Sequence, residues 1–410
     1  MACPIYPMTS EPDASHTDSP IHFEVLATDG KARASRLTFT NGDRKCLTPM
    51  FMPVGTQGSL KGLTSQQLID LECQVVLGNT YHLANRPGTD VLKSQGGLAN
   101  FMSYKSGGTL TDSGGFQMVS LLDLADINET GVNFQSPVDG QQMLLTPEKS
   151  MQIQKDIGAD IIMALDDVVS SVATDEKRFE EATHRTLRWI DRCITAHVNT
   201  KNQALFGIVQ GGLDPRLREI CLDGLKERDA SLPGYAIGGL AGGEEKMEFC
   251  KVVSQCCDAL PVNKPRYVMG VGYPLDLVLC SALGADMYDC VYPSRTARFG
   301  TALVEGGTIR LRTKQFANDY RPIDEACDCL VCKQYTRASL HATITKEPQA
   351  ASLLTYHNIR HQMRLCQQMH AAILDGAFAS FASQYVRKQY PKKDEPEWVR
   401  AALNMGGIDL

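Results

Sequence analysis

The sequence has no hydrophobic run long enough to cross a membrane and no positive charge near its start. None of its apolar segments approaches the roughly 18 residues that a spanning helix needs, so we expect no membrane insertion. Lys and Arg are absent from the first 30 residues, which excludes a usual signal peptide or mitochondrial presequence. We expect residues 1–20, rich in Pro, Ser, Thr and Asp, to form a disordered N-terminal tail.

An excess of positive charge is lacking as well. The formal net charge is −6, so the surface as a whole does not suit a polyanion, and any contact with nucleic acid must be local. Fourteen cysteines are present, but most lie singly within apolar segments, as at Cys221, Cys250 and Cys280. That scatter is typical of buried free thiols in a reducing compartment, and we therefore expect a cytoplasmic protein.

Eight short apolar runs recur along the chain, and each ends in a polar or glycine-rich turn. Amphipathic helical patterns fill most of the gaps, the longest over residues 176–198. Apolar strands that alternate with such helices indicate a parallel sheet, and eight units over about 250 residues predict an α/β fold of the closed (β/α)₈ barrel (TIM barrel) type. An open doubly wound sheet is the alternative, but no glycine-rich dinucleotide fingerprint follows the first run. The runs are residues 50–54, 74–77, 108–110, 160–165, 205–209, 235–237, 266–269 and 285–288.

The barrel pattern also suggests where the chain divides. We expect one barrel domain over residues 21–385, beginning with a β-hairpin that turns at Asp29-Gly30. Asp214-Pro215 and Thr146-Pro147 read as helix starts, with a capping residue followed by proline at the first helical position. Residues 386–410 are expected to form a basic C-terminal tail or helix.

Two aspartates at the ends of predicted strands carry most of the functional signal. Asp112 lies in Gly-Thr-Leu-Thr-Asp-Ser-Gly-Gly-Phe-Gln, and Asp289 lies in Met-Tyr-Asp-Cys-Val-Tyr-Pro-Ser-Arg. Barrel enzymes keep their reacting groups on the loops that follow the strands. Two carboxylates there suggest a nucleophile paired with an acid/base, the combination that displaces a group at a sugar anomeric carbon. Helix capping is the alternative interpretation of either residue alone.

Other strand ends would face the same mouth. Acids, glycines and one amide follow the predicted strands, at Asp166-Asp167, Gln210-Gly211-Gly212, Gly238-Gly239-Leu240 and Met269-Gly270-Val271-Gly272. Glycine lets a backbone come close to a ligand, and the acids and the amide can pair with its polar edge. The set therefore suits a flat heterocycle rich in hydrogen-bond donors.

A cysteine cluster late in the chain has the spacing of a metal site. Cys327-x-Cys329-x₂-Cys332 lies in a polar segment, and His357 follows on a helical pattern. Three thiolates and one imidazole fill a tetrahedral Zn²⁺, so we predict a structural zinc within residues 320–360, an insertion near the C-terminal end of the barrel. Three other histidines downstream, His341, His361 and His370, are alternatives for the fourth ligand.

Two basic segments could supply a local nucleic-acid contact. Residues 292–321 contain six Lys or Arg against two acids, and residues 384–393 contain four with no acid. A solvated charged surface is the alternative for both. Arg295 and Arg298 directly follow the turn at Asp289, so they can reach nucleotides that flank whatever Asp289 attacks.

These motifs together resemble the tRNA-guanine transglycosylase (queuine tRNA-ribosyltransferase) family over residues 22–380. The resemblance is carried by Thr-Asp-Ser-Gly-Gly-Phe-Gln, Gly-Ile-Val-Gln-Gly-Gly, Ile-Gly-Gly-Leu-Ala-Gly-Gly-Glu, Asp-Cys-Val-Tyr-Pro-Ser-Arg and the Cys₃His spacing. It implies an exchange of the wobble guanine, position 34, in tRNAs with GUN anticodons for a deazaguanine. It also implies a (β/α)₈ barrel that bears a structural zinc, in agreement with the pattern above.

The resemblance also implies roles for individual residues. Asp289 would be the nucleophile that attacks ribose C1′ in the anticodon loop, and Asp112 would be the general acid/base. Phe116 and Met269 would sandwich the ring, and Arg295 and Arg298 would contact the neighbouring uridines. The residues implied in binding of the base are Ser113, Phe116, Asp166, Gln210, Gly239, Leu240, Gly242, Met269 and Gly270.

Two positions favour queuine over its smaller precursor. Gly242 stands where bacterial family members usually carry valine, and Val168 stands where they carry cysteine. The loss of a branched side chain would leave space for the cyclopentenediol of queuine. The pattern therefore resembles the eukaryotic catalytic subunit.

Several alternatives remain open at this stage. The chain could be a non-catalytic paralogue, but such a subunit would lose the working carboxylates, and both are present. A zinc-stabilised RNA-binding module and a barrel glycosidase are further hypotheses, and each leaves part of the pattern unexplained. The family allows a homodimer or a heterodimer with a non-catalytic paralogue, and the sequence does not decide a nuclear pool or peripheral association with the mitochondrial outer membrane.

Overall fold

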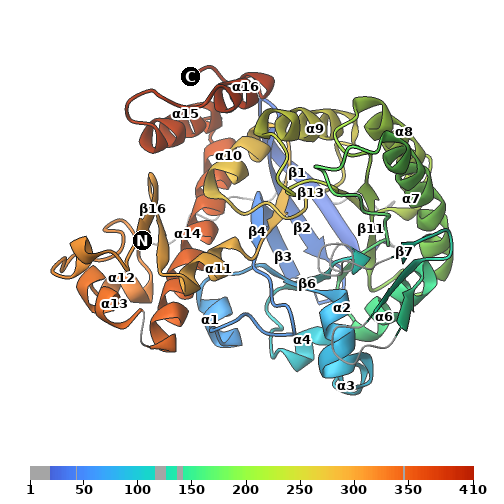
Figure 1. The fold of residues 1–410 in the computed structure, drawn as a ribbon, viewed down its shortest axis with the longest axis horizontal. Helices are drawn as coiled ribbons and strands as arrows, with labels where there is room; N and C mark the ends of the chain where they lie inside the picture. Colours follow the sequence, from blue (N-terminus) through green and yellow to red (C-terminus); the bar gives the residue numbers. More distant parts are fainter. Residues whose placement is uncertain (1–18, 43, 116–125, 136–141, 345–346) are drawn as a thin grey trace.

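Eight parallel strands form the centre of the molecule (Figure 1). The computed structural model describes residues 19–42, 44–115, 126–135, 142–344 and 347–410. The predicted tail therefore falls outside the described residues except for its last two, and so does Phe116. The eight strands are β4 (Met50–Met52), β5 (Val75–Gly78), β6 (Gly108–Thr111), β10 (Ile161–Met163), β11 (Ala204–Val209), β12 (Gly234–Ile237), β13 (Arg266–Val268) and β14 (Met287–Asp289).

The strand order shows a closed barrel. Neighbours in the sheet run β4-β14-β13-β12-β11-β10-β6-β5, and every one of these pairs is parallel. A parallel bridge between Val54 and Leu77 joins the two ends. All eight predicted runs thus correspond to strands, and the prediction of a (β/α)₈ barrel is confirmed. Continuous apolar runs arise because both faces of such strands are buried, one inside the barrel and one beneath the helices.

The helices that surround the barrel begin where local sequence signals place them. Thr146 caps α6 (Pro147–Ile157) by accepting from the Lys149 amide at 3.2 Å. Asp214 caps α8 (Pro215–Lys226) by accepting from the Arg216 amide at 2.8 Å. The helix expected over residues 176–198 is α7 (Glu176–Ala196). The other helices on this part of the chain are α1 (Ser65–Asp70), α2 (Thr80–Leu83), α3 (Thr89–Ser94), α4 (Leu98–Phe101), α9 (Lys246–Ala259) and α10 (Pro274–Ala282).

A small antiparallel sheet closes the amino-terminal end of the barrel. Strands β1 (Ile21–Asp29), β2 (Ala32–Phe39) and β3 (Arg44–Thr48) form it, and β1 and β2 are the predicted hairpin. Leu37 and Phe39 are buried among side chains of the barrel interior. Arg44 forms an ion pair with Asp160, just before β10, and Arg33 forms one with Asp286, just before β14. The opposite end of the barrel is therefore left for a site.

The chain after the last barrel strand builds a separate lobe at the left of Figure 1. It contains α11 (Tyr292–Arg298), the hairpin β15 (Thr301–Val304) and β16 (Gly307–Arg310), and the short helices α12 (Leu330–Gln334) and α13 (Arg337–Thr343). The long helix α14 (Pro348–Leu374) then returns to the barrel, where it packs against α11, β2 and β4.

Two further helices end the described chain. Helix α15 (Phe378–Gln389) packs against α10 and α14, and α16 (Glu397–Met405) packs against α9 and α10. A second small sheet, β7 (Asp126–Ile127), β8 (Val132–Gln135) and β9 (Gln142–Leu145), lies between β6 and α6 in the chain. Among the described residues, no helix is both long and apolar enough to cross a membrane.

Candidate functional site

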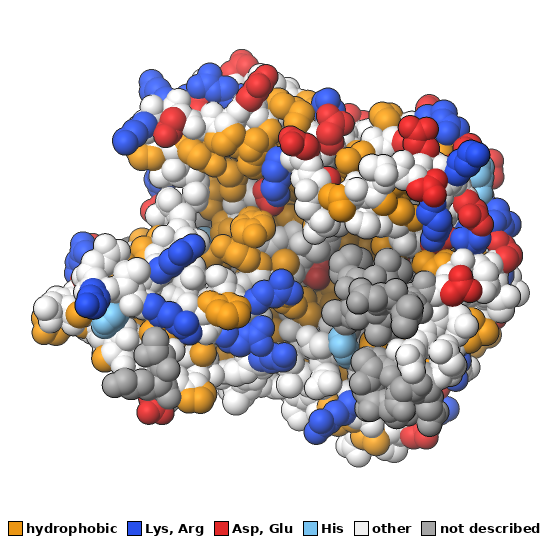
Figure 2. All heavy atoms as spheres, in the orientation of Figure 1, with side chains coloured by type: hydrophobic (Ala, Val, Ile, Leu, Met, Phe, Trp, Pro, Cys, Tyr) orange, Lys and Arg blue, Asp and Glu red, His pale blue; other side chains and the backbone are white. Residues whose placement is uncertain are grey.

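A cavity of about 500 Å³ opens at the carboxyl ends of the barrel strands. Figure 2 shows this face hollowed, with Lys and Arg side chains gathered beside hydrophobic ones at the edge of the hollow. Residues from the loops after all eight strands meet there, which confirms that the strand ends share one mouth. The lining includes Lys61, Asn79, His82, Asp112, Ser113, Asp166, Val168, Gln210, Gly238, Gly239, Leu240, Ala241, Tyr267, Met269, Gly270, Asp289, Cys290, Arg295 and Arg298.

Asp112 is held rigidly at the end of β6. The Asn79 side-chain amide donates to one carboxylate oxygen, and the Thr80 backbone amide donates to the other at 2.9 Å. The Thr80 hydroxyl also donates to the backbone carbonyl of Asp112. The carboxylate is buried, with 6% of its residue surface exposed, so its position is set by these contacts rather than by solvent. Asn79 and Thr80 follow β5 directly, and sequence reasoning missed both.

Asp289 ends β14 on the other side of the same cavity. It accepts hydrogen bonds from the Tyr267 hydroxyl and from the Gly270 amide, the latter at 2.9 Å. Burial raises the pKa of Asp289 to about 6, against the lowering effect of these two donors. The charge of Asp112 adds to the rise, which places the two carboxylates within electrostatic reach of each other. Tyr267 was not among the predicted site residues.

A third acid, Asp166, is paired with an amide and a hydroxyl. Ser113 donates to one carboxylate oxygen at 2.8 Å, and the Gln210 side chain donates to the other at 2.7 Å. Burial raises the pKa of Asp166 to about 6, although both donors lower it. The structure therefore brings together Ser113, Asp166 and Gln210, which the sequence assigned to one pocket wall. Each carboxylate oxygen has a second lone pair with which it can accept a further bond from a ligand.

The glycines at residues 238 and 239 are explained by the side chains of Gln210 and Ile208, since a Cβ at Gly238 would lie 2.6 Å from the Ile208 Cγ2 atom. A Cβ at Gly239 would lie 2.3 Å from the Gln210 Oε1 atom, and a Cβ at Gly238 would lie 3.1 Å from its Nε2 atom. Gly239 also has a φ of +68°, a conformation that other residues rarely adopt. The amide of Gln210 can thus pack flat against the loop after β12. Leu240 and Ala241 continue this loop along the cavity.

Arg218 supports the loops from behind, and sequence reasoning missed it. Its guanidinium is fully buried and donates to the backbone carbonyls of Val209, Gly212 and Gly238 at 2.8, 2.8 and 2.9 Å. Those carbonyls belong to the last residue of β11 and to the loops that follow β11 and β12, so one side chain fixes the walls that carry Gln210 and Gly239. An Arg on an amphipathic helix gives no sequence signal of this role.

Replacement of Arg218 by Met is expected to lower the free energy of unfolding by roughly 3 kcal/mol, because three buried carbonyls each lose a hydrogen bond from the guanidinium and a carbonyl left unpaired costs about 1–3 kcal/mol. Urea denaturation measures the change. Arg216→Met is the matched control, since the Arg216 side chain is 59% exposed and pairs with the surface carboxylates of Glu180 and Asp214. The control is expected to change stability by no more than about 0.5 kcal/mol. Equal losses in both variants would contradict the role of Arg218.

His82 and Lys61 complete the wall beside Asp112, and neither was predicted. Burial lowers the pKa of His82 below its ordinary value, and the charge of Asp112 opposes this effect. The imidazole is thus biased toward its neutral form, in which one ring nitrogen can donate and the other can accept. Lys61 contributes a positive charge on the side of the cavity that holds Asp112, in addition to the charges of Arg295 and Arg298.

Of the remaining predicted residues, some line the cavity and others do not. Met269 lines the cavity, whereas Gly270 uses its amide for Asp289. Gly242 follows the lining residue Ala241, and a Cβ at Gly242 would lie 2.6 Å from the Ser171 Oγ atom. The space beside Gly242 is thus filled by a hydroxyl of this chain. Phe116, predicted to stack on the base, lies outside the described residues.

The four predicted metal ligands converge at one point. The Sγ atoms of Cys327, Cys329 and Cys332 and the Nδ1 atom of His357 all lie within 4.8 Å of one another. His357 Nδ1 is 3.7, 3.6 and 3.3 Å from the three sulfurs. Such separations fit ligands about 2.0–2.3 Å from a shared tetrahedral ion. The cluster can therefore hold a metal ion.

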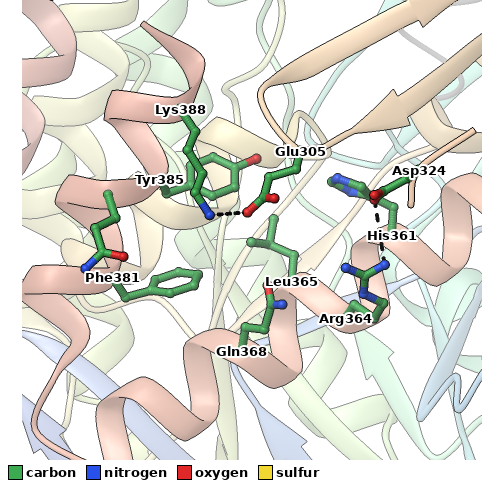
Figure 3. A pocket seen from close by; sticks show the side chains of 10 residues that line it. Glu305, Asp324, His361, Arg364, Leu365, Gln368, Phe381, Tyr385 and Lys388 are labelled. Atoms are coloured by element: carbon green, nitrogen blue, oxygen red, sulfur yellow. Dashed lines mark hydrogen bonds and ion pairs between the residues drawn. The ribbon is translucent and has the colours of Figure 1, made fainter. Parts of the chain in front are cut away.

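The contacts of the four candidate histidines show which of them belongs to the cluster. The other ring nitrogen of His357 lies 2.7 Å from the Leu303 carbonyl, to which it can donate, so Nδ1 is left free to bind a metal. His341 and His370 place a ring nitrogen against the backbone carbonyls of Leu311 and Thr48. His361 lines a separate small hollow between α14 and α15 (Figure 3).

The two basic segments differ in how their charges are used. Arg295 and Arg298 are exposed on α11 and line the cavity. In the second segment, Lys388 forms an ion pair with Glu305, as Figure 3 shows, and Arg387 pairs with the buried carboxylate of Glu395. Those two charges are neutralised by carboxylates of the protein itself. The first segment is therefore the better candidate for a phosphate contact.

Comparison with known proteins agrees with the geometry of the site. A family model described as queuine tRNA-ribosyltransferase matches residues 29–391. The chain is 49% identical over 401 residues to the queuine tRNA-ribosyltransferase catalytic subunit of Schizosaccharomyces pombe, covering 95% of this chain and 98% of that protein. It is 47% identical over 405 residues to the catalytic subunit of Caenorhabditis elegans, covering 95% and 100%. It is 45% identical over 389 residues to the queuine tRNA-ribosyltransferase of Thermus thermophilus, covering 95% and 99%.

Proposed function

The chain belongs to the queuine tRNA-ribosyltransferase family, and on that premise we propose that it exchanges the wobble guanine of tRNAs with GUN anticodons for queuine. One observation supports this most: Asp112 and Asp289 line one cavity at the carboxyl ends of the barrel strands. A non-catalytic paralogue, the alternative from the sequence, has no use for two such carboxylates. The reaction class is that of a pentosyltransferase, which moves the ribose of the RNA from one base to another.

The two carboxylates divide the chemistry between them. In the first step an oxygen of Asp289 forms a bond to ribose C1′, the C1′–N9 bond breaks, and the electron pair leaves with guanine. Asp112 donates the proton that the departing base needs. In the second step Asp112 takes a proton from the incoming base, which attacks C1′ and releases Asp289. The RNA strand stays intact because no phosphodiester bond takes part.

The pocket wall accounts for selection of the base. Asp166 can accept hydrogen bonds from the N–H groups of a purine-like ring, while Gln210 and the backbone of Gly239 and Leu240 can pair with its other edge. A base that lacks one of these groups leaves a buried polar atom unpaired, which costs far more than the loss of a surface contact. Met269 supplies an apolar surface for one face of the ring, and Phe116 is proposed for the other face.

The pH dependence of adduct formation should report the nucleophile. Only ionised Asp289 can attack, so the rate in a single turnover is expected to rise with pH through a midpoint near 6, the pKa to which burial raises this group. Asp166 has a similar pKa and contributes to the same limb. Tyr267→Phe removes a hydrogen bond that lowers the pKa of Asp289, so its midpoint should lie at higher pH. A midpoint that Tyr267→Phe leaves unchanged would argue against Asp289 as the titrating group.

Replacement of Gly242 by Val is expected to raise the KM for queuine about tenfold or more, with a much smaller effect on guanine. A valine there has no free space in the protein, so its branched side chain, or the loop that it displaces, would take the space proposed for the cyclopentenediol. It would also collide with Ser171, whose hydroxyl donates to Glu244 at 2.7 Å. Glu244 in turn accepts from the Ala241 and Gly242 amides at 2.7 and 2.9 Å.

Ser171→Ala separates the two explanations for the Gly242 effect. If Ser171→Ala alone weakens queuine, the valine acts by loosening the loop at Ala241. If Ser171→Ala has no effect, direct loss of space is the cause. Equal increases in KM for queuine and guanine in Gly242→Val would contradict the assignment of this region to the substituent of the base.

We also propose that the Cys₃His cluster holds a structural Zn²⁺. Three thiolates and an imidazole leave no ligand position open for a substrate, so the ion would tie the segment with the three cysteines to α14 rather than take part in the reaction.

The names of the yeast and nematode relatives describe catalytic subunits, which supports assembly with a second subunit. A dimer, either of two copies of this chain or of this chain with a non-catalytic paralogue, is therefore proposed. A cytoplasmic location is proposed on different grounds, namely the many single cysteines, which suit a reducing compartment. Size-exclusion chromatography with light scattering, with and without the partner, distinguishes the two assemblies.

Incubation with tRNA and radiolabelled guanine tests the proposed function. A transglycosylase incorporates the label into the RNA without cutting it, and unlabelled queuine then blocks further incorporation. A glycosidase would release guanine and leave an abasic site, whereas an RNA-binding module would bind the RNA without change. Absence of incorporation into a GUN-anticodon tRNA, alone and with a partner subunit, would refute the proposal.

A further inference from the structure

Two tyrosine rings pack against each other at the edge of the cavity, and the mechanism above does not use them. Tyr273 immediately precedes α10, and Tyr292 is the first residue of α11, three residues after Asp289. Their ring centroids are 4.2 Å apart at an interplanar angle of 44°. Tyr273 is 54% exposed, so much of its ring is open to solvent. Exposed aromatic rings of this kind are typical of surfaces that receive a ligand.

The local backbone brings the two rings together. A Cβ at Gly272 would lie 2.2 Å from the Cβ of Cys290, so only glycine lets the loop before α10 lie directly on the loop after Asp289. The Gln362 side chain holds this arrangement by donating to the Gly272 carbonyl at 2.6 Å. The position of Tyr273 is thus fixed relative to the nucleophile.

A positive charge also lies against the Tyr273 ring. The Lys246 Nζ atom lies 5.7 Å from the centre of the Tyr273 ring and 2.6 Å from a carboxylate oxygen of Asp276, which is buried. The same ammonium lies 5.1 Å from the Phe249 ring and 5.8 Å from the Trp398 ring. Tyr273 is therefore held by a cation and a second ring, and more than half of its surface remains open.

Charge indicates which ligand can approach this open ring. Arg295 and Arg298 are exposed on α11, about one and two turns along the helix from Tyr292, and both line the cavity. A separate hollow is lined by Lys246 together with Glu244, Glu245 and Glu397, so it is acidic overall. A polyanion would thus pass over α11 and avoid the acidic hollow. Figure 2 shows hydrophobic side chains next to a group of Lys and Arg on this side of the mouth.

The proposed reaction creates a need for such a ring. A base can reach Asp289 only after it leaves its stack in the RNA, which deprives the neighbouring base of a stacking partner. Aromatic side chains replace that partner in many proteins that bind single-stranded nucleic acid, and they tolerate any base. We propose that Tyr273, backed by Tyr292, stacks on the base of a nucleotide that flanks the target guanosine, while Arg295 and Arg298 contact the adjoining phosphates. This site rests on the proposed function and extends it to the neighbouring nucleotide.

The test pairs protein variants with RNA hairpins that carry the GUN anticodon loop. One hairpin is intact, one lacks the base on the 5′ side of the target, and one lacks the base on the 3′ side. Exchange of labelled guanine is measured for the wild type, Tyr273→Ala and Tyr273→Phe, once with the hairpin varied at saturating guanine and once with guanine varied at saturating hairpin. Tyr273→Ala is expected to raise the KM for the intact hairpin roughly tenfold, with the KM for guanine unchanged. Tyr273→Phe keeps the ring and is expected to stay within about twofold of the wild type.

The hairpins decide between stacking and a merely structural effect. If Tyr273 stacks on a base, the rise in KM caused by Tyr273→Ala disappears on the hairpin that lacks that base. On this hairpin the wild type has already lost the stacking contact. Equal losses on all three hairpins, or no loss on the intact one, would overturn the proposal while exchange by the wild type continues. No exchange by the wild type on the intact hairpin would instead refute the proposed function itself.

Discussion

Asp289→Asn is expected to abolish base exchange, with a loss of about 10⁴-fold or more and no covalent RNA adduct. Removal of a catalytic nucleophile has effects of this size in other enzymes, because the remaining groups cannot form the intermediate. The asparagine keeps a carbonyl oxygen that can accept from Tyr267 and Gly270, so the loop should keep its shape. Exchange of labelled guanine and a denaturing gel for the protein–RNA adduct measure the two consequences.

The control for Asp289→Asn makes the same chemical change on the surface. Asp223 lies on α8 with a side chain that is 64% exposed, and Asp223→Asn should exchange guanine at the rate of the wild type. Thermal denaturation of both variants shows whether either one has lost its fold. If Asp289→Asn kept more than a few per cent of the activity in a folded protein, the nucleophile would have to be another group.

Asp112→Asn is expected to lower kcat by about 10²–10⁴-fold, the range that general acid–base catalysis contributes. The variant can still accept from the Thr80 amide, and Asn79 can turn its side chain to pair with the new amide. Binding of tRNA should therefore persist. Rapid-quench measurement of adduct formation is the direct assay, since departure of guanine is the step that needs the proton.

Asn79→Ala is the matched comparison for Asp112→Asn. It removes one hydrogen bond to the Asp112 carboxylate and leaves the acid in place, so a loss of only about tenfold is expected. A loss in Asp112→Asn no larger than the loss in Asn79→Ala would indicate that Asp112 serves to shape the pocket rather than to move a proton.

The sequence predicted the barrel because its strands have a simple physical signature. Both faces of a barrel strand are buried, so each strand is a continuous apolar run, and all eight runs were found. Helix starts were equally clear where a capping residue precedes proline, as at Thr146 and Asp214. Strand β3 was not predicted, because its exposed and buried residues alternate over only five positions.

The site was predictable only where a residue stands at a strand end. Asp112, Asp166, Gln210 and Asp289 follow strands, and the closed barrel brings them to one mouth. Tyr267 lies within β13 and Arg218 within α8, where neither residue type is unusual. Their roles come from contacts across the fold, which local patterns do not record. Asn79 could have been found, since it follows β5 as the other site residues follow their strands.

The metal-binding histidine and the space beside Gly242 depend on the three-dimensional fold for a different reason. Spacing selected the three cysteines, but several histidines were compatible with it, and only the fold brings His357 to the sulfurs. At Gly242 the sequence suggested empty space, whereas the Ser171 hydroxyl stands where a Cβ would point. A glycine such as Gly242 indicates that another group lies close to its backbone. The sequence does not say whether this group belongs to the substrate or to the protein.

Identification of the residue that carries the RNA tests the central claim most directly. The wild-type protein is incubated with a tRNA or hairpin without free base, denatured, and digested with nuclease and protease before mass spectrometry of the peptides. The predicted result is a ribose linked through an ester to the peptide that contains Asp289, and its loss when guanine or queuine is added before denaturation. A ribose on any other residue, or exchange without a covalent adduct, would contradict the mechanism.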